Sequence, residues 1–186
     1  MIHKLDSIYV INPLKEHSQI KDTLLELINQ QESYEHLYEP EDGVNITKCD
    51  WSTSRWDRGR PWAQKLMEYL GPHLNTTIEE MGYVECKVHE LWFQQYETSS
   101  THGWHVHGQN WTNVYYLDLP DGTPKTQFIN PFDQKTICEF DVKEGDVLTF
   151  PSYVIHRAPV NNSNKQKTII SWNMDTELKP GLYKNE

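Results

Sequence analysis

The sequence contains few cysteines, no long apolar run and no excess of basic residues. Its three cysteines in 186 residues are widely spaced, which excludes a disulfide framework and a CxxC zinc site and leads us to expect a cytoplasmic protein. No apolar run approaches the roughly 20 residues of a membrane span, and the N-terminus lacks the apolar block of a signal peptide. A formal net charge of −10 argues against nucleic acid as the main partner.

Aromatic residues are abundant, at 12% of the chain, which suits either an aromatic-walled barrel or an aromatic-rich core. We expect one domain over residues 1–186, in which a helical and loop layer (1–82) supports a β core (83–176). A strand is expected at 7–12, ended by Pro13. Apolar residues at helical spacing then predict an amphipathic helix over 17–31, with Ser18 as its N-cap.

Residues 61–81 predict two further helices. An apolar stripe after Pro61 indicates the first, which should end at Gly71. Pro72 then suits the first turn of a second helix that ends before Gly82.

The connection over residues 33–60 is long for a structureless loop. It should therefore be either a functional lid or a segment that contains short elements. Its basic cluster, Arg55, Arg58 and Arg60, alternates with two tryptophans. We interpret this cluster as a solvated surface, with a substrate-contacting loop as the alternative.

Residues 83–176 have the pattern of an all-β region. Short strands separated by turn signals, such as Pro-Asp-Gly at 120–122, are typical of a sandwich or a barrel. The expected strands are 84–96, 104–107, 113–119, 126–129, 135–142, 146–150 and 168–174. The predicted fold class is therefore mainly β with N-terminal helices.

Three histidines, His102, His105 and His107, lie within six residues. Residues at i and i+2 of a strand project from one face, so His105 and His107 can bind one metal ion if a third ligand joins them. His156, which follows the segment GDVLTFP, is the best candidate. Three imidazoles on one face of an octahedron leave positions open for a cosubstrate and O₂. We therefore predict a metal site at His105, His107 and His156.

The segment 91–173 resembles the double-stranded β-helix (jelly-roll) core of the Fe(II)/2-oxoglutarate-dependent oxygenases, in particular their prolyl-hydroxylase-like branch and its phage members. That family has His-x-Asp/Glu, a YYL strand, Gly-Asp-x-x-x-Phe before a distal His, and a basic residue on the last core strand. The matching residues here are His105-Val106-His107, Tyr115-Tyr116-Leu117, Gly145 to Phe150, His156, and Lys167 in KTIISWN. The resemblance covers less than half of the chain.

The resemblance implies an oxygenase that uses Fe(II), 2-oxoglutarate and O₂ to hydroxylate a peptidyl or amino-acid side chain or another small molecule. Lys167 is the implied partner of the far carboxylate of 2-oxoglutarate, with Lys165 as the alternative. The other candidates are Tyr116, Tyr96 and Gln94 for the cosubstrate pocket, and Arg157 and Trp104 for the substrate.

One position departs from the family pattern, because the second ligand is usually a carboxylate and here it is His107. Three interpretations stay open: His107 ligates, it only lies nearby, or the site prefers another metal. We favour the first. Glu97 and Asp118 are the remaining carboxylate candidates.

Two other functions are compatible with the sequence. Cupins share the fold and often use HxH with a distal His, and their second motif is partly met by Gly145, Pro151, His156 and Asn161. The glutamate that cupins have shortly after HxH is missing here. A non-enzymatic β-barrel module with structural zinc would recruit His102 as a fourth ligand.

Overall fold

The computed structural model describes residues 7–32, 34–54, 57 and 59–178. Its helices are α1 (His17–Gln30) and α2 (Pro61–Glu80), with short 3₁₀ turns η1 (Pro40–Asp42) and η2 (Trp51–Thr53). The larger sheet contains β1 (Val10–Pro13), β2 (Glu35–Glu39), β3 (Val44–Cys49), β4 (Tyr83–Tyr96), β6 (Trp111–Asp118), β9 (Asp146–Pro151) and β11 (Lys167–Leu178). The smaller sheet contains β5 (His102–His105), β7 (Gln127–Ile129), β8 (Ile137–Glu139) and β10 (His156–Ala158).

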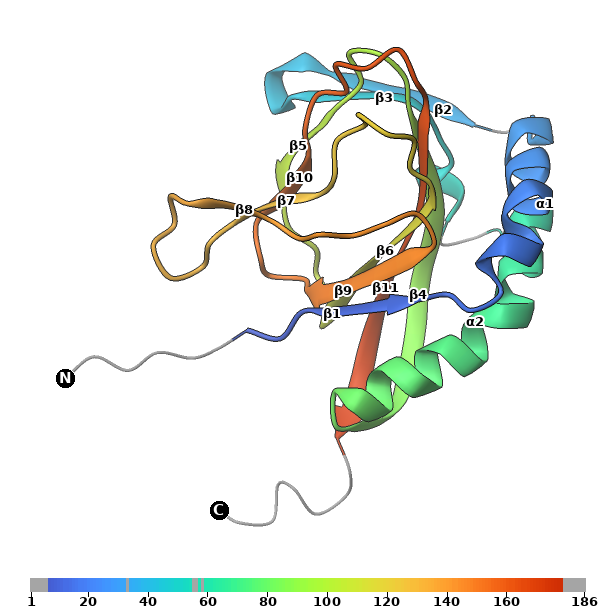
Figure 1. The fold of residues 1–186 in the computed structure, drawn as a ribbon, viewed down its shortest axis with the longest axis vertical. Coiled ribbons are helices and arrows are strands. Elements are labelled where there is room, and N and C mark those ends of the chain that lie inside the picture. Colours follow the sequence, from blue (N-terminus) through green and yellow to red (C-terminus); the bar gives the residue numbers. More distant parts are fainter. Residues whose placement is uncertain (1–6, 33, 55–56, 58, 179–186) are drawn as a thin grey trace.

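The two antiparallel sheets form a jelly roll whose larger sheet is covered on its outer side by both helices (Figure 1). The strand orders are β1-β9-β6-β11-β4-β3-β2 and β5-β10-β7-β8. The predicted fold class, mainly β with N-terminal helices, is confirmed. Within the described ranges, neither helix is both long and apolar enough to cross a membrane.

Helix α1 has the predicted amphipathic pattern, because its buried residues Ile20, Leu24 and Ile28 recur every fourth position. The expected N-cap at Ser18 is wrong. The helix begins at His17, so Glu16 occupies the N-cap position and Ser18 lies inside the first turn.

Helix α2 is continuous, and the predicted break at Gly71 is wrong. Pro72 lies inside the helix. One apolar stripe runs along its whole length: Trp62, Leu66, Leu70, Leu74 and Ile78, each at most 5% exposed. Burying five large side chains contributes more than the ~3 kcal/mol that an internal proline costs a helix.

The long connection contains short elements, which was one of its two expected forms. Strand β3 pairs with β4 through Lys48↔Gln95 and Cys49↔Gln94, so the N-terminal part contributes strands to the larger sheet as well as helices.

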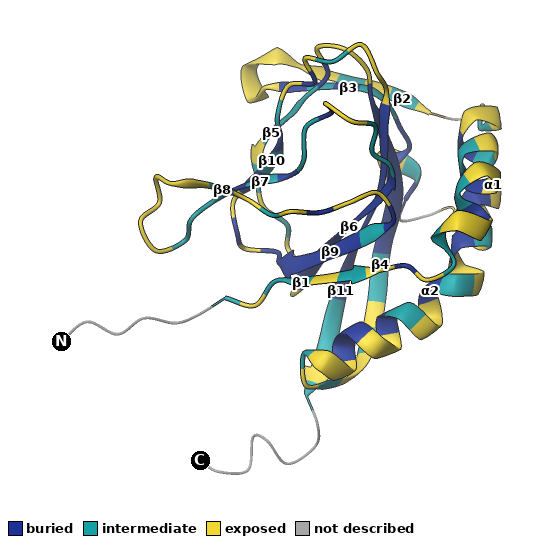
Figure 2. Cartoon of the chain, in the orientation of Figure 1, coloured by how far each residue is buried: buried dark blue, intermediate teal, exposed yellow. Residues whose placement is uncertain are grey.

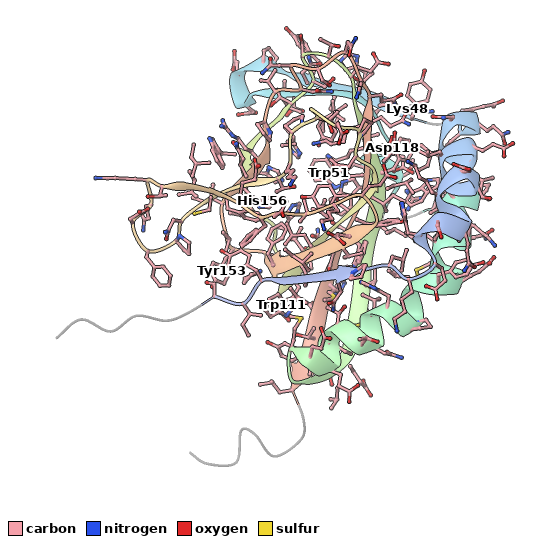
Figure 3. The ribbon with its side chains drawn as sticks, in the orientation of Figure 1. Lys48, Trp51, Trp111, Asp118, Tyr153 and His156 are labelled. Carbon is pink, nitrogen blue, oxygen red and sulfur yellow. The ribbon has the colours of Figure 1, made fainter. Side chains whose placement is uncertain are left out.

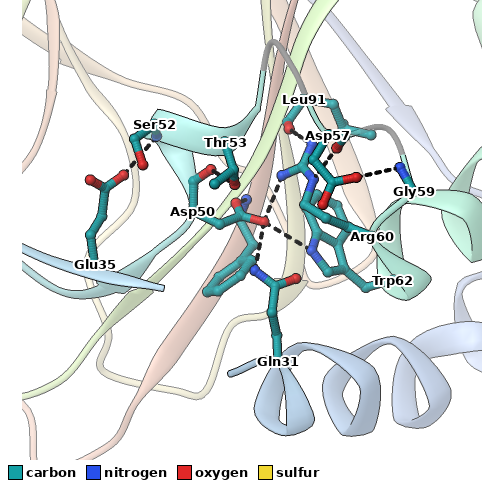
Figure 4. A network of polar contacts seen from close by, with 11 residues as sticks. Gln31, Glu35, Asp50, Ser52, Thr53, Asp57, Gly59, Arg60, Trp62 and Leu91 are labelled. Atoms are coloured by element: carbon teal, nitrogen blue, oxygen red, sulfur yellow. Dashed lines mark hydrogen bonds and ion pairs between the residues drawn. The ribbon is translucent and has the colours of Figure 1, made fainter. Parts of the chain in front are cut away.

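Arg60, at the end of this connection, is not solvated, which corrects the predicted surface cluster. It is 5% exposed, and its Nη1 lies 2.6 Å from Oδ2 of buried Asp50 (Figure 4). Asp50 also accepts hydrogen bonds from Trp62 Nε1 and Phe93 N. Arg55 and Arg58 lie outside the described residues.

Alternation along β11 separates the two sides of the larger sheet. Ile170, Trp172 and Met174 belong to the apolar layer under the helices. Ile169 and Ser171 line the barrel interior, and Lys167 and Asn173 share their face by alternation. Figure 2 shows that buried residues concentrate in β6, β9 and the adjoining halves of β4 and β11, whereas the far halves of β4 and β11 are intermediate or exposed.

Candidate metal centre

His105, His107 and His156 meet inside the barrel, where their ligand atoms lie within 4.8 Å of one another. His105 ends β5 and pairs in register with His156 at the start of β10, and their ring centroids are 4.3 Å apart. His107 lies beyond the end of β5, so the expectation that it shares a strand with His105 is wrong. Its backbone N–H donates instead to the carbonyl of Ser152 (3.0 Å), and its ring centroid lies 5.0 Å from that of His105 and 5.2 Å from that of His156. Figure 3 shows the position of His156 within the barrel.

Backbone carbonyls orient two of these rings. Nδ1 of His105 lies 2.7 Å from the carbonyl of Gly103, and Nδ1 of His156 lies 2.9 Å from that of Val154. Gly103 is also a point of close approach, because a Cβ there would collide with the carbonyl oxygen of Asp42. A residue without a side chain therefore allows the η1 turn to contact β5.

The surroundings keep all these imidazoles neutral. Burial, reinforced by repulsion from His105, lowers the pKa of His107 to about 3. Burial is also the main cause that lowers the pKa of His105 and, more strongly, of His156. Neutral imidazole is the form that binds metal, so at pH 7 these rings need lose no charge before doing so.

His102 adds a fourth imidazole beside the group of three. Its ring stacks on His105 with centroids 3.9 Å apart. The ring centroid of Trp51 lies 6.5 Å from that of His102 and 6.1 Å from that of Trp92, on which it stacks, and Trp51 is 38% exposed (Figure 3). These rings form an aromatic wall beside the histidines.

Lys167 is buried at 1% exposure. Its Nζ donates to the carbonyl of Pro124 (2.7 Å) and lies 4.8 Å from the ring centroid of Tyr96, and no carboxylate in the described part of the chain forms an ion pair with it. Burial lowers its pKa to about 7. Lys165 is exposed and donates to the carbonyl of Asp121 (3.1 Å), so Lys167 is the lysine that faces inward.

Gln94 and Tyr96 line a narrow cavity of about 30 Å³ together with the histidines. Nε2 of Gln94 lies 3.4 Å from Nδ1 of His102. Tyr116 is fully buried and donates to Oγ1 of Thr126 (2.8 Å), and burial raises its pKa to about 12.

Arg157 and Trp104 contact each other on the smaller sheet, with the guanidinium 4.3 Å from the indole centroid. Nε and Nη2 of Arg157 both donate to Oε1 of Gln127. Trp104 precedes His105 on β5 and therefore faces the opposite side, where it is 38% exposed.

Neither expected carboxylate belongs to the centre. Asp118 forms an ion pair with Lys21 (2.7 Å) towards helix α1, and Glu97 is exposed at the end of β4.

A buried carboxylate, Glu90, is linked to His107 through Asn173, and sequence reasoning missed it. Glu90 is 5% exposed and accepts a hydrogen bond from Nδ2 of Asn173 (3.0 Å), and the same nitrogen lies 3.3 Å from Nδ1 of His107. Alternation was the available signal, because Glu90 shares its face of β4 with Trp92 and Gln94.

A larger cavity of about 420 Å³ lies between α2 and β4, and its lining is mainly apolar, with side chains such as Met67, Leu74 and Val88. Glu90 lines it but none of the three histidines does, so we take the barrel interior as the functional site.

No protein-family model matches the sequence, and no curated protein matches it. Solved structures do match. An oxidoreductase of the 2OG-Fe(II) oxygenase family from Burkholderia pseudomallei aligns with a TM-score of 0.69 and 12% identity, over 90% of this chain and 84% of its own. The viral collagen prolyl hydroxylase of Paramecium bursaria Chlorella virus-1, in its 2OG complex, aligns with a TM-score of 0.62 and 12% identity, over 91% and 96%.

The alpha-ketoglutarate-dependent epimerase SnoN of nogalamycin biosynthesis also aligns, with a TM-score of 0.71 and 14% identity, over 94% of this chain and 82% of its own. At such low identity these matches show the fold. The resemblance to Fe(II)/2-oxoglutarate-dependent oxygenases, which the sequence motifs indicated over part of the chain, is thereby confirmed for the fold as a whole.

Proposed function

We propose that this chain is an Fe(II)- and 2-oxoglutarate-dependent oxygenase, with Fe(II) held by His105, His107 and His156. The observation that carries the proposal is the meeting of three neutral, buried imidazoles from two separate segments, within 4.8 Å of one another. Lys167, a buried lysine on β11 that forms no ion pair with a carboxylate among the described residues, contacts the ring of Tyr96, which lines the cavity beside the histidines.

The donor set fits a divalent first-row metal. Imidazole nitrogen suits iron, zinc, copper and nickel, and three such donors leave coordination positions open. The three histidines carry no ligand charge, so the bound ion would keep its full positive charge. A dianionic cosubstrate would compensate for that charge.

Lys167 supports 2-oxoglutarate as this cosubstrate, because a buried cation without an ion pair is stabilised by an incoming carboxylate. Tyr96 connects the two parts of the site, since its ring contacts Lys167 and also lines the cavity beside the histidines. That cavity is small, so 2-oxoglutarate must displace side chains as it binds. Gln94 is the best candidate to move, because its contact with His102 is long, and Tyr116 is proposed as a second donor.

Fe(II), when bound, would supply O₂ activation coupled to oxidative decarboxylation of 2-oxoglutarate. The residues of this chain contribute position and dryness. The imidazoles hold the metal, Lys167 orients the cosubstrate, and the buried Trp92 keeps water from one side of the site.

Hydroxylation of a peptidyl or amino-acid side chain is the specific reaction that we propose. Two of the matched structures are a collagen prolyl hydroxylase and a prolyl hydroxylase bound to a peptide fragment, whereas SnoN is an epimerase. Arg157 and the half-exposed Trp104 are proposed to contact the substrate. We propose a reducing cytoplasm as the compartment, which suits the three free cysteines, and we propose no nucleic-acid or membrane partner.

The alternatives are a three-His metal dioxygenase or isomerase of cupin type and a non-enzymatic β-barrel metal-binding module, and the second candidate that the site favours is the module with zinc. The observation that favours it is His102, whose ring stacks on His105 and would provide a fourth imidazole for a closed zinc site.

Anaerobic titration of the Fe(II) protein with 2-oxoglutarate distinguishes these functions. The oxygenase should develop a weak charge-transfer band in the visible range, and Lys167→Ala should abolish it while leaving metal binding intact. Lys165→Ala is the matched control and should behave as wild type, because Lys165 is exposed. Tight zinc binding by four histidines with no such band would support the second candidate. Succinate release against a panel of peptides, amino acids and small metabolites would then identify the substrate.

A further inference from the structure

The three histidines differ in what their second ring nitrogen contacts. Nδ1 of His105 faces the carbonyl of Gly103, and Nδ1 of His156 faces the carbonyl of Val154. A carbonyl oxygen only accepts, so in both neutral rings the proton is on Nδ1 and the lone pair is on Nε2. These two rings are therefore ready to bind a metal through Nε2.

His107 has the opposite arrangement. Its Nδ1 lies 3.3 Å from Nδ2 of Asn173, whose side chain is buried at 1% exposure. An amide nitrogen only donates, so Nδ1 of His107 accepts and the proton of the neutral ring is on Nε2. His107 then presents an N–H group, and no lone pair, at Nε2, the ring nitrogen that does not contact the amide.

Glu90 determines which way the amide of Asn173 points. Nδ2 of Asn173 donates to Oε2 of Glu90 (3.0 Å), while its Oδ1 accepts from Oγ1 of Thr112 (3.1 Å). A carboxylate cannot donate, so turning the amide over would place Oδ1 against the Glu90 oxygens. Thr112 does not oppose the turn, because a hydroxyl can donate or accept. Glu90 is thus the group that holds the amide in place.

We propose that Asn173, held by Glu90, keeps His107 in the tautomer that does not bind metal, so that this pair of positioning residues controls whether the third ligand engages. For His107 to bind through Nε2, a proton must leave Nε2 and one must arrive at Nδ1, which leaves the ring neutral. The amide must also turn so that Oδ1 accepts from Nδ1–H. In the turned amide, Oδ1 of Asn173 is repelled by the Glu90 carboxylate. This repulsion opposes metal binding by His107 and makes it a weaker ligand than His105 and His156. The metal part of this inference rests on the proposed function, whereas the tautomer of the free protein does not.

The test is to exchange the two side chains, in the double variant Glu90→Gln with Asn173→Asp. The exchange conserves the net charge of the pair and nearly conserves its shape, and it moves the carboxylate next to His107. The carboxylate introduced at position 173 would then accept from His107 Nδ1–H, from the new amide at position 90 and from Thr112. Long-range ¹H–¹⁵N NMR of the metal-free proteins should show His107 protonated on Nε2 in the wild type and on Nδ1 in the variant, with His105 and His156 unchanged.

Affinity for Co(II), measured by calorimetry, should rise by about 10- to 100-fold in the exchange variant, the usual range for a residue that orients a metal-binding histidine. A matched control is Glu85→Gln with Asn75→Asp, which makes the same changes at exposed positions and should alter neither readout.

A wild-type spectrum with His107 protonated on Nδ1 would overturn the inference without any variant, and so would an exchange variant with unchanged tautomer and affinity. Both results leave the proposed function intact. Conversely, failure of the wild type to bind 2-oxoglutarate would refute the proposed function and leave the tautomer result standing.

Discussion

Two buried polar clusters flank strand β4, and they follow opposite rules. In the first, the Asp50 carboxylate meets the Arg60 guanidinium, the Trp62 indole N–H and the backbone N–H of Phe93, so its charge is fully compensated (Figure 4). In the second, the interior of the barrel, Lys167 has a carbonyl as its partner and the histidines are kept neutral by burial. A compensated cluster stabilises the fold. An uncompensated one is maintained at a cost in stability, which is typical of a site that receives a ligand.

Of the variants considered, removal of the Asp50 side chain should change the free energy of unfolding most. Asp50→Ala should lower the free energy of unfolding by about 3–5 kcal/mol, because it leaves the Arg60 guanidinium buried without a carboxylate. Urea denaturation followed by circular dichroism measures this loss. Asp141→Ala is the control, because its side chain is 90% exposed and its removal should leave the unfolding curve unchanged. If both variants behaved alike, the Asp50 cluster would not be a stabilising one.

Removing the charge of Lys167 should have the opposite sign. Lys167→Met should raise the free energy of unfolding at pH 7 by about 2 kcal/mol, since a buried, unpaired ammonium is replaced by an apolar side chain. The folded-state pKa is about 7 and the unfolded value is about 10.4. Between these values the unfolded chain binds more protons, so wild-type stability rises with pH and the advantage of the variant should shrink by pH 10.

Denaturation curves at pH 7 and pH 10 test this expectation, with Lys165→Met as the exposed control that should change little at either pH. A Lys167→Met variant that was less stable than wild type at pH 7 would place Lys167 among the compensated groups.

Binding of 2-oxoglutarate should draw a proton onto Lys167. In the protein without 2-oxoglutarate, the pKa of Lys167 is about 7, so the lysine is mostly neutral at pH 8. An incoming carboxylate favours the ammonium form, so proton uptake should approach one proton per site. Calorimetry of the Co(II) protein in two buffers of different ionisation enthalpy measures the uptake. Identical heats in the two buffers would show that the lysine does not meet the ligand.

The smallest expected effect is that of Tyr116→Phe. This variant loses one buried hydrogen bond to Thr126 and should be destabilised by about 1 kcal/mol, with 2-oxoglutarate affinity reduced a few-fold. Tyr153→Phe is a suitable control, because that side chain is 65% exposed. A loss of affinity as large as that of Lys167→Met would make Tyr116 a main contact of the cosubstrate.

Periodicity in the sequence predicted helix α1, an all-β region and most of its strands, because the patterns there are local. The resemblance to the oxygenase family, and not periodicity, predicted the jelly roll. The continuity of α2 was not predictable from local signals. Gly71 and Pro72 both indicate a helix end, and only contact with the sheet keeps the helix intact. The burial of Arg60 was not predictable either. It depends on the carboxylate of Asp50, ten residues earlier, and on the backbone carbonyl of Leu91, 31 residues later.

The candidate site divides in the same way. The spacing of the histidines predicted that His105, His107 and His156 come together, and their ligand atoms lie within 4.8 Å of one another. Lys167 was implied by the resemblance, and it is buried on β11 of the larger sheet. The role of the histidines as ligands stays a prediction. The contact between Glu90 and Asn173 joins β4 to β11, two strands whose pairing no local pattern reveals. The contact between Glu90 and Asn173 could therefore be found only in the three-dimensional structure.

Gly103 performs two tasks at one position. The missing side chain admits the turn at Asp42, and the carbonyl receives the Nδ1–H of His105. The conformation of the 40–43 turn is therefore coupled, through Gly103, to the orientation of the His105 ring. A longer turn, or any larger residue at position 103, would displace the Gly103 carbonyl and with it the His105 ring. Directed evolution of the loops around the site should therefore leave the 40–43 turn and Gly103 unchanged.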